Sequence, residues 1–369
     1  MFGRNTFLAG NIKCFEKGNT MNEFRYNFQE PDVCFDYYRK YTNLLIEELQ
    51  PKNNKFNLKS IKQLNFNYLW DDSVNAGSRE FKELDMISVN EGTIYKLYGL
   101  FYKLNTKKDI IELTHKTKSR TPINTKIFYE NDKIDDKPME IEIVFSDDKN
   151  SNSIAEYMAM FAIKWIIAHE VGHAFNGHTA YYSEVRKKIQ SEKNEEEIAK
   201  LFLDLQSMEM DADAFAVNRI IDVAMDLYKK DDKIFKLLKN KQDILKLIIC
   251  SVHAIFFIFR NCDVYDCMKT EHPPTFIREC LVLGAMKQGL LKKYNVIVDD
   301  DYMMNDIGKI ENLICDIEGK KNEDYINYIN NFHQEIKKYM TRIQSNFKNN
   351  IIYKINDESR LPIEGIDYL

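Results

Sequence analysis

The motif His169-Glu170-Val171-Gly172-His173 constrains the fold of this chain more than any other feature of its sequence. On a helix, residues four apart project from the same face, so the imidazoles of His169 and His173 can share one metal ion. Glu170 lies next to that face, where its carboxylate can hold and deprotonate a metal-bound water molecule. The motif therefore predicts a helix with a metal site on one face.

The flanking residues indicate a helix on independent grounds. Ser153-Ile154-Ala155-Glu156 has the form of a capping box, which predicts a helix start, and Asn176-Gly177 is typical of a helix end. Gly172 inside this helix costs about 1 kcal/mol relative to alanine, which indicates that another part of the chain packs closely there. We therefore expect a metal-binding helix that ends at about Phe175.

A catalytic zinc ion usually has three protein ligands and one open position, so a third ligand is expected. His178 is one candidate, although it lies beyond the Asn176-Gly177 stop. The extended metzincin form of the motif needs a histidine at position 179, which is Thr179 here. Glu209 is the better candidate, because it lies within a predicted helix among small and apolar residues. A solvated acidic helix face is the plain alternative for Glu209.

Three further residues are candidates for supporting or catalytic roles. Asp213 lies one helical turn after Glu209, so it can accept a hydrogen bond from the spare ring N–H of a ligand histidine. His272, fixed ahead of a helix by Pro273-Pro274, is a candidate donor to the oxyanion of a tetrahedral intermediate, or else a plain turn histidine. Arg278 can support His272 or form an ion pair. The remaining histidines, His115, His253 and His333, have no partners in sequence and are interpreted as structural.

Helical periodicity dominates the rest of the chain. The expected helices carry apolar residues at three- and four-residue spacing; they are 32–49, 94–104, 195–228, 244–259, a helix that begins after Pro274 and charged helical segments after Asp299. The expected strands are 86–89, 126–129 and 139–145. The last of these alternates apolar and acidic residues, as an edge strand with one buried face does.

Composition narrows the class of protein. The hydrophobic fraction of 44% and charged fraction of 30% are typical of a soluble globular protein. The net charge of -5 gives no support to a nucleic-acid-binding surface. Seven scattered cysteines without a Cys-x-x-Cys pair favour reduced thiols in a reducing compartment. Residues 244–259 fall short of the about 20 apolar residues of a membrane span. We therefore expect a cytoplasmic protein without a membrane span.

The order of these motifs resembles that of the gluzincins, the thermolysin-like clan of zinc peptidases whose third zinc ligand is a glutamate on a later helix. The motifs are His169-Glu170-x-x-His173, Glu209-x-x-x-Asp213 and His272-Pro273 with Arg278. The last two are similar to those of the HtpX and prenyl-protein endopeptidase family, whose members are integral membrane enzymes. Over about residues 86–291 the chain resembles the phage-exclusion peptidase Lit family. That resemblance implies cleavage of a host protein, in that family a translation elongation factor, to abort phage infection.

These observations together predict an α+β, mostly α fold: a zincin-like catalytic core with a small sheet and an active-site helix, and helical flanking regions. We expect an N-terminal helical region in 1–80, a metallopeptidase domain in 81–295 and a C-terminal helical region in 296–369. The expected activity is zinc-dependent (Zn²⁺) endopeptidase cleavage of a protein or peptide substrate, with strand 139–145 pairing with the substrate backbone.

In this mechanism zinc on His169, His173 and Glu209 lowers the pKa of its water towards about 7 and polarises the scissile carbonyl. Glu170 passes the water's proton to the leaving amine. The alternative is a zinc-stabilised non-catalytic regulatory or toxin module, favoured by a closed four-ligand site with His178 as fourth ligand. A peptidase fused to a DNA-binding module ranks lower, because there is no clear helix-turn-helix or basic patch.

Overall fold

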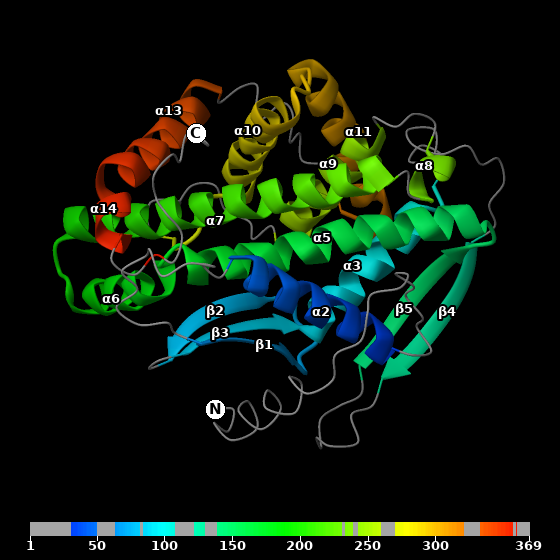
Figure 1. Ribbon diagram of the computed structural model, residues 1–369, viewed down its shortest axis with the longest axis horizontal. Coiled ribbons are helices and arrows are strands. Elements are labelled where there is room, and N and C mark those ends of the chain that lie inside the picture. Colours follow the sequence, from blue (N-terminus) through cyan, green and yellow to red (C-terminus); the bar gives the residue numbers. More distant parts are fainter. Residues whose placement is uncertain are drawn as a thin grey trace.

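One buried helix, α5 (Lys149–Phe175), runs through the middle of the molecule (Figure 1). The computed structural model describes residues 31–49, 63–81, 84–107, 122–129, 139–230, 233–238, 243–259, 270–320, 333–356 and 359. From Met158 to Phe175 every residue of α5 is buried, as expected of a helix that is apolar on nearly all sides. Because helices and a sheet surround it, α5 forms the core of the fold.

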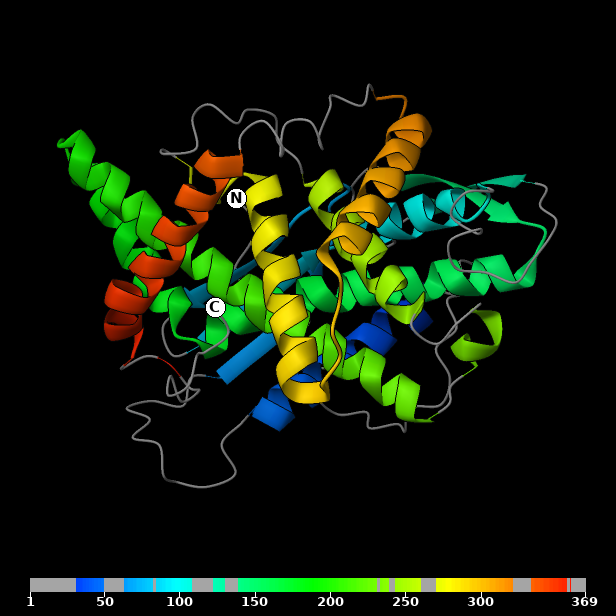
Figure 2. The same ribbon diagram turned by 90° about the horizontal axis from the view of Figure 1, so that it is seen from above.

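Helices cover one side of α5. On that side, the two helices with the most extensive contact to α5 are α7 (Glu195–Lys230) and α9 (Asp243–Ile258). Against these pack α10 (Thr275–Tyr294), α11 (Asp300–Glu318) and α13 (His333–Asn346), the last followed by the π-helix η2 (Phe347–Ile351) and α14 (Ile352–Ile355). Seen from above, α10 (yellow) crosses the direction of α5 (Figure 2). The short helices α6 (His178–Ser191) and α8 (Ile234–Leu237) complete this part.

A small sheet and two helices cover the other side of α5 (Figure 1). The strand order is β1-β3-β2: β1 (Gln63–Leu69) runs parallel to β3 (Leu84–Asn90), and β2 (Ala76–Phe81) runs antiparallel to it. Edge strand β2 packs against α5 and α6. Helices α2 (Pro31–Leu49) and α3 (Glu91–Leu104) also contact α5. A separate antiparallel hairpin, β4 (Pro122–Tyr129) and β5 (Met139–Ser146), leads into the first turn of α5.

The α+β, mostly α fold predicted from the sequence is confirmed. The strands β1 and β2 and the helix α6 were not among the expected elements. The expected boundary after residue 80 falls inside β2, and both new strands pair with β3. Strand β2 (AGSREF) has almost no apolar alternation, so its pairing with β3, and not its own pattern, makes it a strand.

The capping box predicted at Ser153 is wrong, because α5 begins one turn earlier. The carboxylate of Asp148 accepts hydrogen bonds from the backbone N–H groups of Asn150 (3.2 Å) and Ser151 (3.1 Å). Asp148 is thus the N-cap, and Ser153 lies inside the helix. The helix end is as predicted: α5 stops at Phe175, and Gly177 adopts a left-handed conformation with φ of 80°.

The close packing expected at Gly172 is present, and the neighbour is Phe215 of α7. A Cβ atom at Gly172 would lie 3.0 Å from Cδ1 of the Phe215 ring. The missing side chain therefore lets α7 approach α5 closely at the level of the His169-to-His173 motif.

The expectations about membrane spans and cysteines can be compared with the described residues. Within the described part of the chain, none of the helices combines the length and apolar character needed to cross a membrane. Among the described residues, the side chains of Cys250, Cys280 and Cys315 are thiols that form no disulfide bond.

We predict that Gly92→Ala destabilises the protein while Gly284→Ala does not. A Cβ atom at Gly92 would lie 2.3 Å from the backbone oxygen of Asp72, which cannot move aside as a side chain can. We expect a loss of about 1–3 kcal/mol in the free energy of unfolding, measured by chemical denaturation. Gly284 is an exposed helical glycine with no atom near a new Cβ, so alanine there should add up to about 1 kcal/mol. Equal stability of the two variants would contradict this packing.

Candidate metal centre

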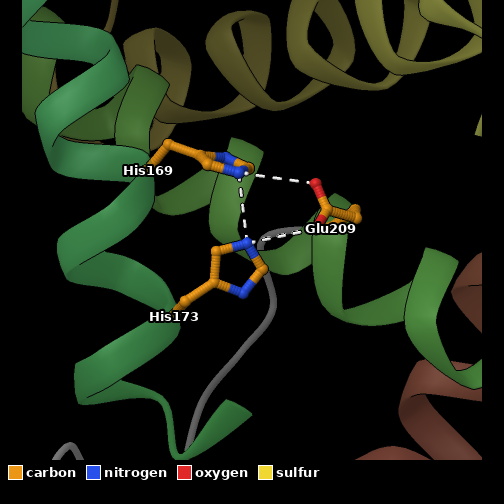
Figure 3. Close-up of side chains that lie close together, drawn as sticks. All are labelled: His169, His173 and Glu209. Carbon is orange, nitrogen blue, oxygen red and sulfur yellow. Dashed lines mark hydrogen bonds and ion pairs between the residues drawn. The ribbon is translucent and has the colours of Figure 1, made fainter. Parts of the chain in front are cut away.

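His169, His173 and Glu209 bring three donor atoms together between α5 and α7 (Figure 3). Nε2 of His169 lies 3.1 Å from Nε2 of His173. The Glu209 carboxylate lies 3.4 Å from the first of these atoms and 3.3 Å from the second. Donors at about 2.0–2.1 Å from a tetrahedral zinc ion are about 3.4 Å apart, so the three distances fit one ion.

The burial and ionisation of the Glu209 carboxylate are also compatible with a bound cation. Glu209 is 2% exposed, and its Oε2 accepts no hydrogen bond from the described residues. Burial raises the pKa of Glu209, but the imidazoles of His272 and His173 outweigh it and hold the pKa well below its usual range. A buried, ionised carboxylate with an oxygen that accepts no hydrogen bond is stabilised by positive charge close to that oxygen. Two imidazoles and a carboxylate are also a donor set that zinc accepts, so the residues fit the metal.

His169 is supported by Asp213 and, through it, by Arg278 of α10. Nδ1 of His169, the nitrogen that faces away from Glu209, lies 2.8 Å from Oδ1 of Asp213. Arg278 donates two hydrogen bonds of 2.8 Å to the same carboxylate, and its Nη2 lies 3.3 Å from Oε2 of Glu209. Burial lowers the pKa of His169, but Asp213 and Glu209 outweigh it and raise the pKa to about 10. The cluster therefore favours a positive charge at His169, whether a proton or a metal ion carries it.

His173 is supported by His178 and Asp211. Nδ1 of His178 lies 3.1 Å from Nδ1 of His173, and its Nε2 lies 3.2 Å from Oδ2 of Asp211. That same carboxylate oxygen accepts a hydrogen bond from Asn176. His178 thus lies behind His173, on the side away from the nitrogen that faces Glu209. It supplies neither a third nor a fourth donor atom to the cluster, because both of its ring nitrogens face other residues.

Glu170 and His272 lie at the edge of the cluster. Glu170 is 7% exposed. Burial lowers the pKa of Arg278, but several carboxylates, among them that of Glu170, outweigh it and raise the pKa. The His272 side chain is 55% exposed, and its Nε2 lies 3.5 Å from Oε1 of Glu209. Although Glu209 raises the pKa of His272, the partial desolvation of the ring, Arg278 and the two neighbouring imidazoles outweigh it and lower the pKa.

Hydrogen bonds fix the segment that carries His272. Gln206 of α7 donates from Nε2 to the backbone oxygen of Thr270 (2.9 Å), and the Thr270 hydroxyl donates to the backbone oxygen of His272 (2.8 Å). Arg186 of α6 donates two hydrogen bonds, of 2.9 and 2.6 Å, to the carboxylate of Glu271. The position of His272 beside Glu209 thus depends on contacts from two helices distant in sequence.

Tyr182 is a residue near the cluster that the sequence did not single out. Its ring lies perpendicular to that of His173, with centroids 6.1 Å apart, and the Arg186 guanidinium lies 4.7 Å above it. Burial and the carboxylates of Glu209 and Glu271 raise the pKa of Tyr182. His178, Tyr182 and Arg186 are four residues apart, so they share one face of α6. The four-residue spacing could have identified this face of α6 from the sequence, but no helix was expected there.

The fold and the site define a mostly helical protein with a candidate metal centre between two buried helices. A model of the Peptidase U49 family matches residues 129–286. The matched part includes every residue of the cluster, from His169 on α5 to Arg278 on α10. No curated protein matches the chain, and no solved structure does. The family match supports a peptidase, and hence a protein or peptide as substrate.

The other histidines lie apart from this cluster. His253 of α9 is fully buried, with Nδ1 2.6 Å from Glu279 of α10 and Nε2 2.9 Å from Glu311 of α11. It links three helices, in keeping with a structural interpretation. His333 begins α13, and His115 lies outside the described residues.

We predict that His253 makes stability depend on pH. Burial lowers its pKa, but Glu279 and Glu311 outweigh it and raise the pKa to about 9. The folded pKa exceeds the unfolded value of about 6.5, so this stabilisation is complete below pH 6.5 and is lost as the pH rises through 9. The loss is on the order of 3 kcal/mol. Denaturation of the chain and of His253→Gln from pH 6.5 to 10 measures it. A stability difference that does not shrink over this range would contradict the assignment.

Proposed function

We propose that this chain is a zinc-dependent endopeptidase of the gluzincin type, which hydrolyses peptide bonds of a protein substrate in the cytosol. The observation that carries the proposal is the convergence of His169, His173 and Glu209, with donor atoms 3.1–3.4 Å apart and Glu170 adjacent on the same helix. The Peptidase U49 match across all of these residues supports it further.

The proposed roles follow from the position of each side chain. When bound by His169, His173 and Glu209, a zinc ion supplies Lewis-acid chemistry that acidifies a water molecule and polarises the scissile carbonyl. Glu170 accepts the water's proton on its carboxylate and delivers it to the nitrogen of the leaving amine. Asp213 holds His169 in the tautomer that leaves Nε2 free to bind, while Arg278 neutralises Asp213.

His272 is proposed to stabilise the negative charge that develops on the carbonyl oxygen. Its side chain is 55% exposed and its Nε2 lies 3.5 Å from Glu209, so it is accessible beside a proposed metal ligand. An N–H donor in this position strengthens its hydrogen bond as the carbonyl oxygen becomes an oxyanion. Tyr182, whose ring contacts that of His173, is a second candidate for this role, and the charge of the Glu209 carboxylate helps to raise its pKa.

The strand proposed to pair with substrate is β2 and not the 139–145 segment expected from the sequence. That segment, β5, leads into the first turn of α5, and 20 residues at about 1.5 Å each separate Lys149 from His169, or about 30 Å. Edge strand β2 packs against α5 and α6, the two helices that carry His173 and His178. An extended peptide can therefore pair with β2 close to the metal ligands.

The alternative of a zinc-stabilised regulatory or toxin module needs a closed set of four ligands. Its proposed fourth ligand, His178, faces His173 and Asp211 instead. The accessible His272 side chain beside Glu209 also fits a site that receives a substrate. The geometry therefore favours the peptidase.

The biological role proposed from the resemblance to the Lit family is phage exclusion through cleavage of a host translation factor. The Peptidase U49 match, to a Lit-like peptidase family, is in keeping with that role. Comparing the proteomes of phage-infected cells that express the chain or Glu170→Gln tests it. Fragments of one translation factor that appear only with the unaltered chain would support the role, and their absence would count against it.

We predict that Glu170→Gln keeps its zinc but loses activity. The substitution removes the proton acceptor while leaving all three proposed ligands in place, so kcat should fall about 10²–10⁴-fold. Zinc content is measured by atomic absorption, and cleavage by mass spectrometry of a peptide library. Glu184→Gln, an exposed carboxyl change on α6, serves as the matched control and should retain activity. If the Glu170→Gln protein binds zinc and cleaves at the normal rate, Glu170 is not the general base.

We predict that His272→Ala lowers kcat about 10²–10³-fold with little change in KM or zinc content. The expected split arises because a donor to the oxyanion acts on the transition state and not on the bound substrate. Steady-state kinetics on a peptide found with the library, together with zinc analysis, provide the measurement. An unchanged kcat, or loss of zinc from this variant, would contradict the proposed role.

A further inference from the structure

His178 is completely buried directly behind His173, and neither ring nitrogen faces the cluster of donor atoms. We propose that His178 is a positioning residue for His173: together with Asp211 it selects the ring tautomer and orientation in which Nε2 of His173 is free to bind the metal. The inference rests on the metal centre of the proposed function and adds to it a residue outside the ligand set.

The tautomer follows from the order of the contacts. Because Oδ2 of Asp211 lies 3.2 Å from Nε2 of His178, a lone pair on that nitrogen would face the lone pairs of a carboxylate. The proton of a neutral His178 therefore belongs on Nε2, although the contact is poorly aligned for a hydrogen bond. Nδ1 of His178 is then a bare acceptor, 3.1 Å from Nδ1 of His173.

The unprotonated Nδ1 of His178 in turn determines which ring nitrogen of His173 carries the proton. Nδ1 of His173 must donate across the 3.1 Å contact, since two lone pairs would otherwise face each other. With its proton on Nδ1, His173 presents a lone pair at Nε2, the atom 3.3 Å from Glu209. The chain of contacts thus prepares His173 as a metal ligand.

The local backbone explains how His178 reaches this position. Gly177, with φ of 80°, turns the chain sharply after α5, so α6 begins at His178 and its ring returns alongside His173. Asn176, whose N–H bonds the backbone oxygen of Gly172, donates from its side chain to Asp211. Asp211 is thus held from the end of α5, and it supports His178 from α7.

The two ligand histidines therefore have different supports. His169 contacts Asp213 directly, and Arg278 neutralises that carboxylate with two hydrogen bonds. A neutral imidazole separates His173 from its carboxylate, so the charge of Asp211 reaches the ligand only through His178. Replacing His178 should consequently affect metal binding without touching a ligand.

The test measures zinc affinity by competition with a chromophoric chelator, and ligand geometry by the visible spectrum of the Co²⁺-substituted protein. His178→Phe fills the buried space but accepts no hydrogen bond, so zinc affinity should fall about 10–100-fold and the Co²⁺ spectrum should change. His178→Asn places Oδ1 near the former Nδ1 and should restore most of the affinity.

Tyr181→Phe is the matched control for damage to α6. It lies on the same helix and loses an equally buried hydrogen bond, 2.6 Å long, to Asp204, which does not contact a ligand histidine. This variant should lose thermal stability and keep its zinc affinity. If it weakens zinc binding as much as His178→Phe does, the effect is structural and the proposal is overturned.

Two outcomes separate this proposal from the proposed function. If the unaltered chain binds one zinc ion, His169→Ala abolishes binding and His178→Phe binds normally, then the metal centre stands and the role of His178 is refuted. If the unaltered chain binds no zinc, the metal centre and the proposed function fail, and the role of His178 fails with them.

Discussion

The buried contact between the imidazoles of α5 and the carboxylates of α7 is the interaction on which the rest of the structure depends. Glu209 and Asp213 are at most 2% exposed, and an unpaired buried carboxylate costs several kcal/mol. Two hydrogen bonds from Arg278 offset this cost for Asp213. Because Arg278 belongs to α10 and Asp213 to α7, this ion pair requires the two helices to lie against each other. Among the described residues, Glu209 contacts imidazoles and, at 3.3 Å, Arg278, and its Oε2 accepts no hydrogen bond. The negative charge of Glu209 is therefore less well compensated than that of Asp213. The fold thus stabilises an anionic site whose donor atoms fit a divalent cation.

The spacing of acidic residues along α7 divides the support of the two ligand histidines. At about 100° per residue, Glu209 and Asp213 lie on one helix face, while Asp211 is turned about 200° from Glu209. Glu209 and Asp213 both contact His169, whereas Asp211 contacts His178. Helical spacing alone indicates that Asp211 points away from the pair, but not that it faces His178, five residues beyond the motif. Helix α7 therefore supports both His169 and His173, the first through Asp213 and the second through Asp211 and His178.

The sequence could predict what local spacing encodes. The helix around His169, its end at Gly177 and the long helix with Glu209 all follow from periodicity and from turn residues. Strand β2 could not be predicted, because its partner β3, and not its composition, makes it a strand. Tyr182 was missed for a similar reason: it lies near His173 only because α6 folds back after the left-handed glycine. Contacts that depend on chain reversal leave little local signal.

Helix α13, in the expected C-terminal helical region 296–369, packs against α7, the helix that carries Glu209. The Tyr339 hydroxyl of α13 donates to Oε1 of Gln206 (2.7 Å), and Nε2 of that amide donates to Thr270 (2.9 Å). One buried glutamine on α7 thus anchors both α13 and the segment that carries His272. Since an amide fixed at both ends holds its orientation better than one fixed at a single end, α13 contributes to the position of His272 beside Glu209.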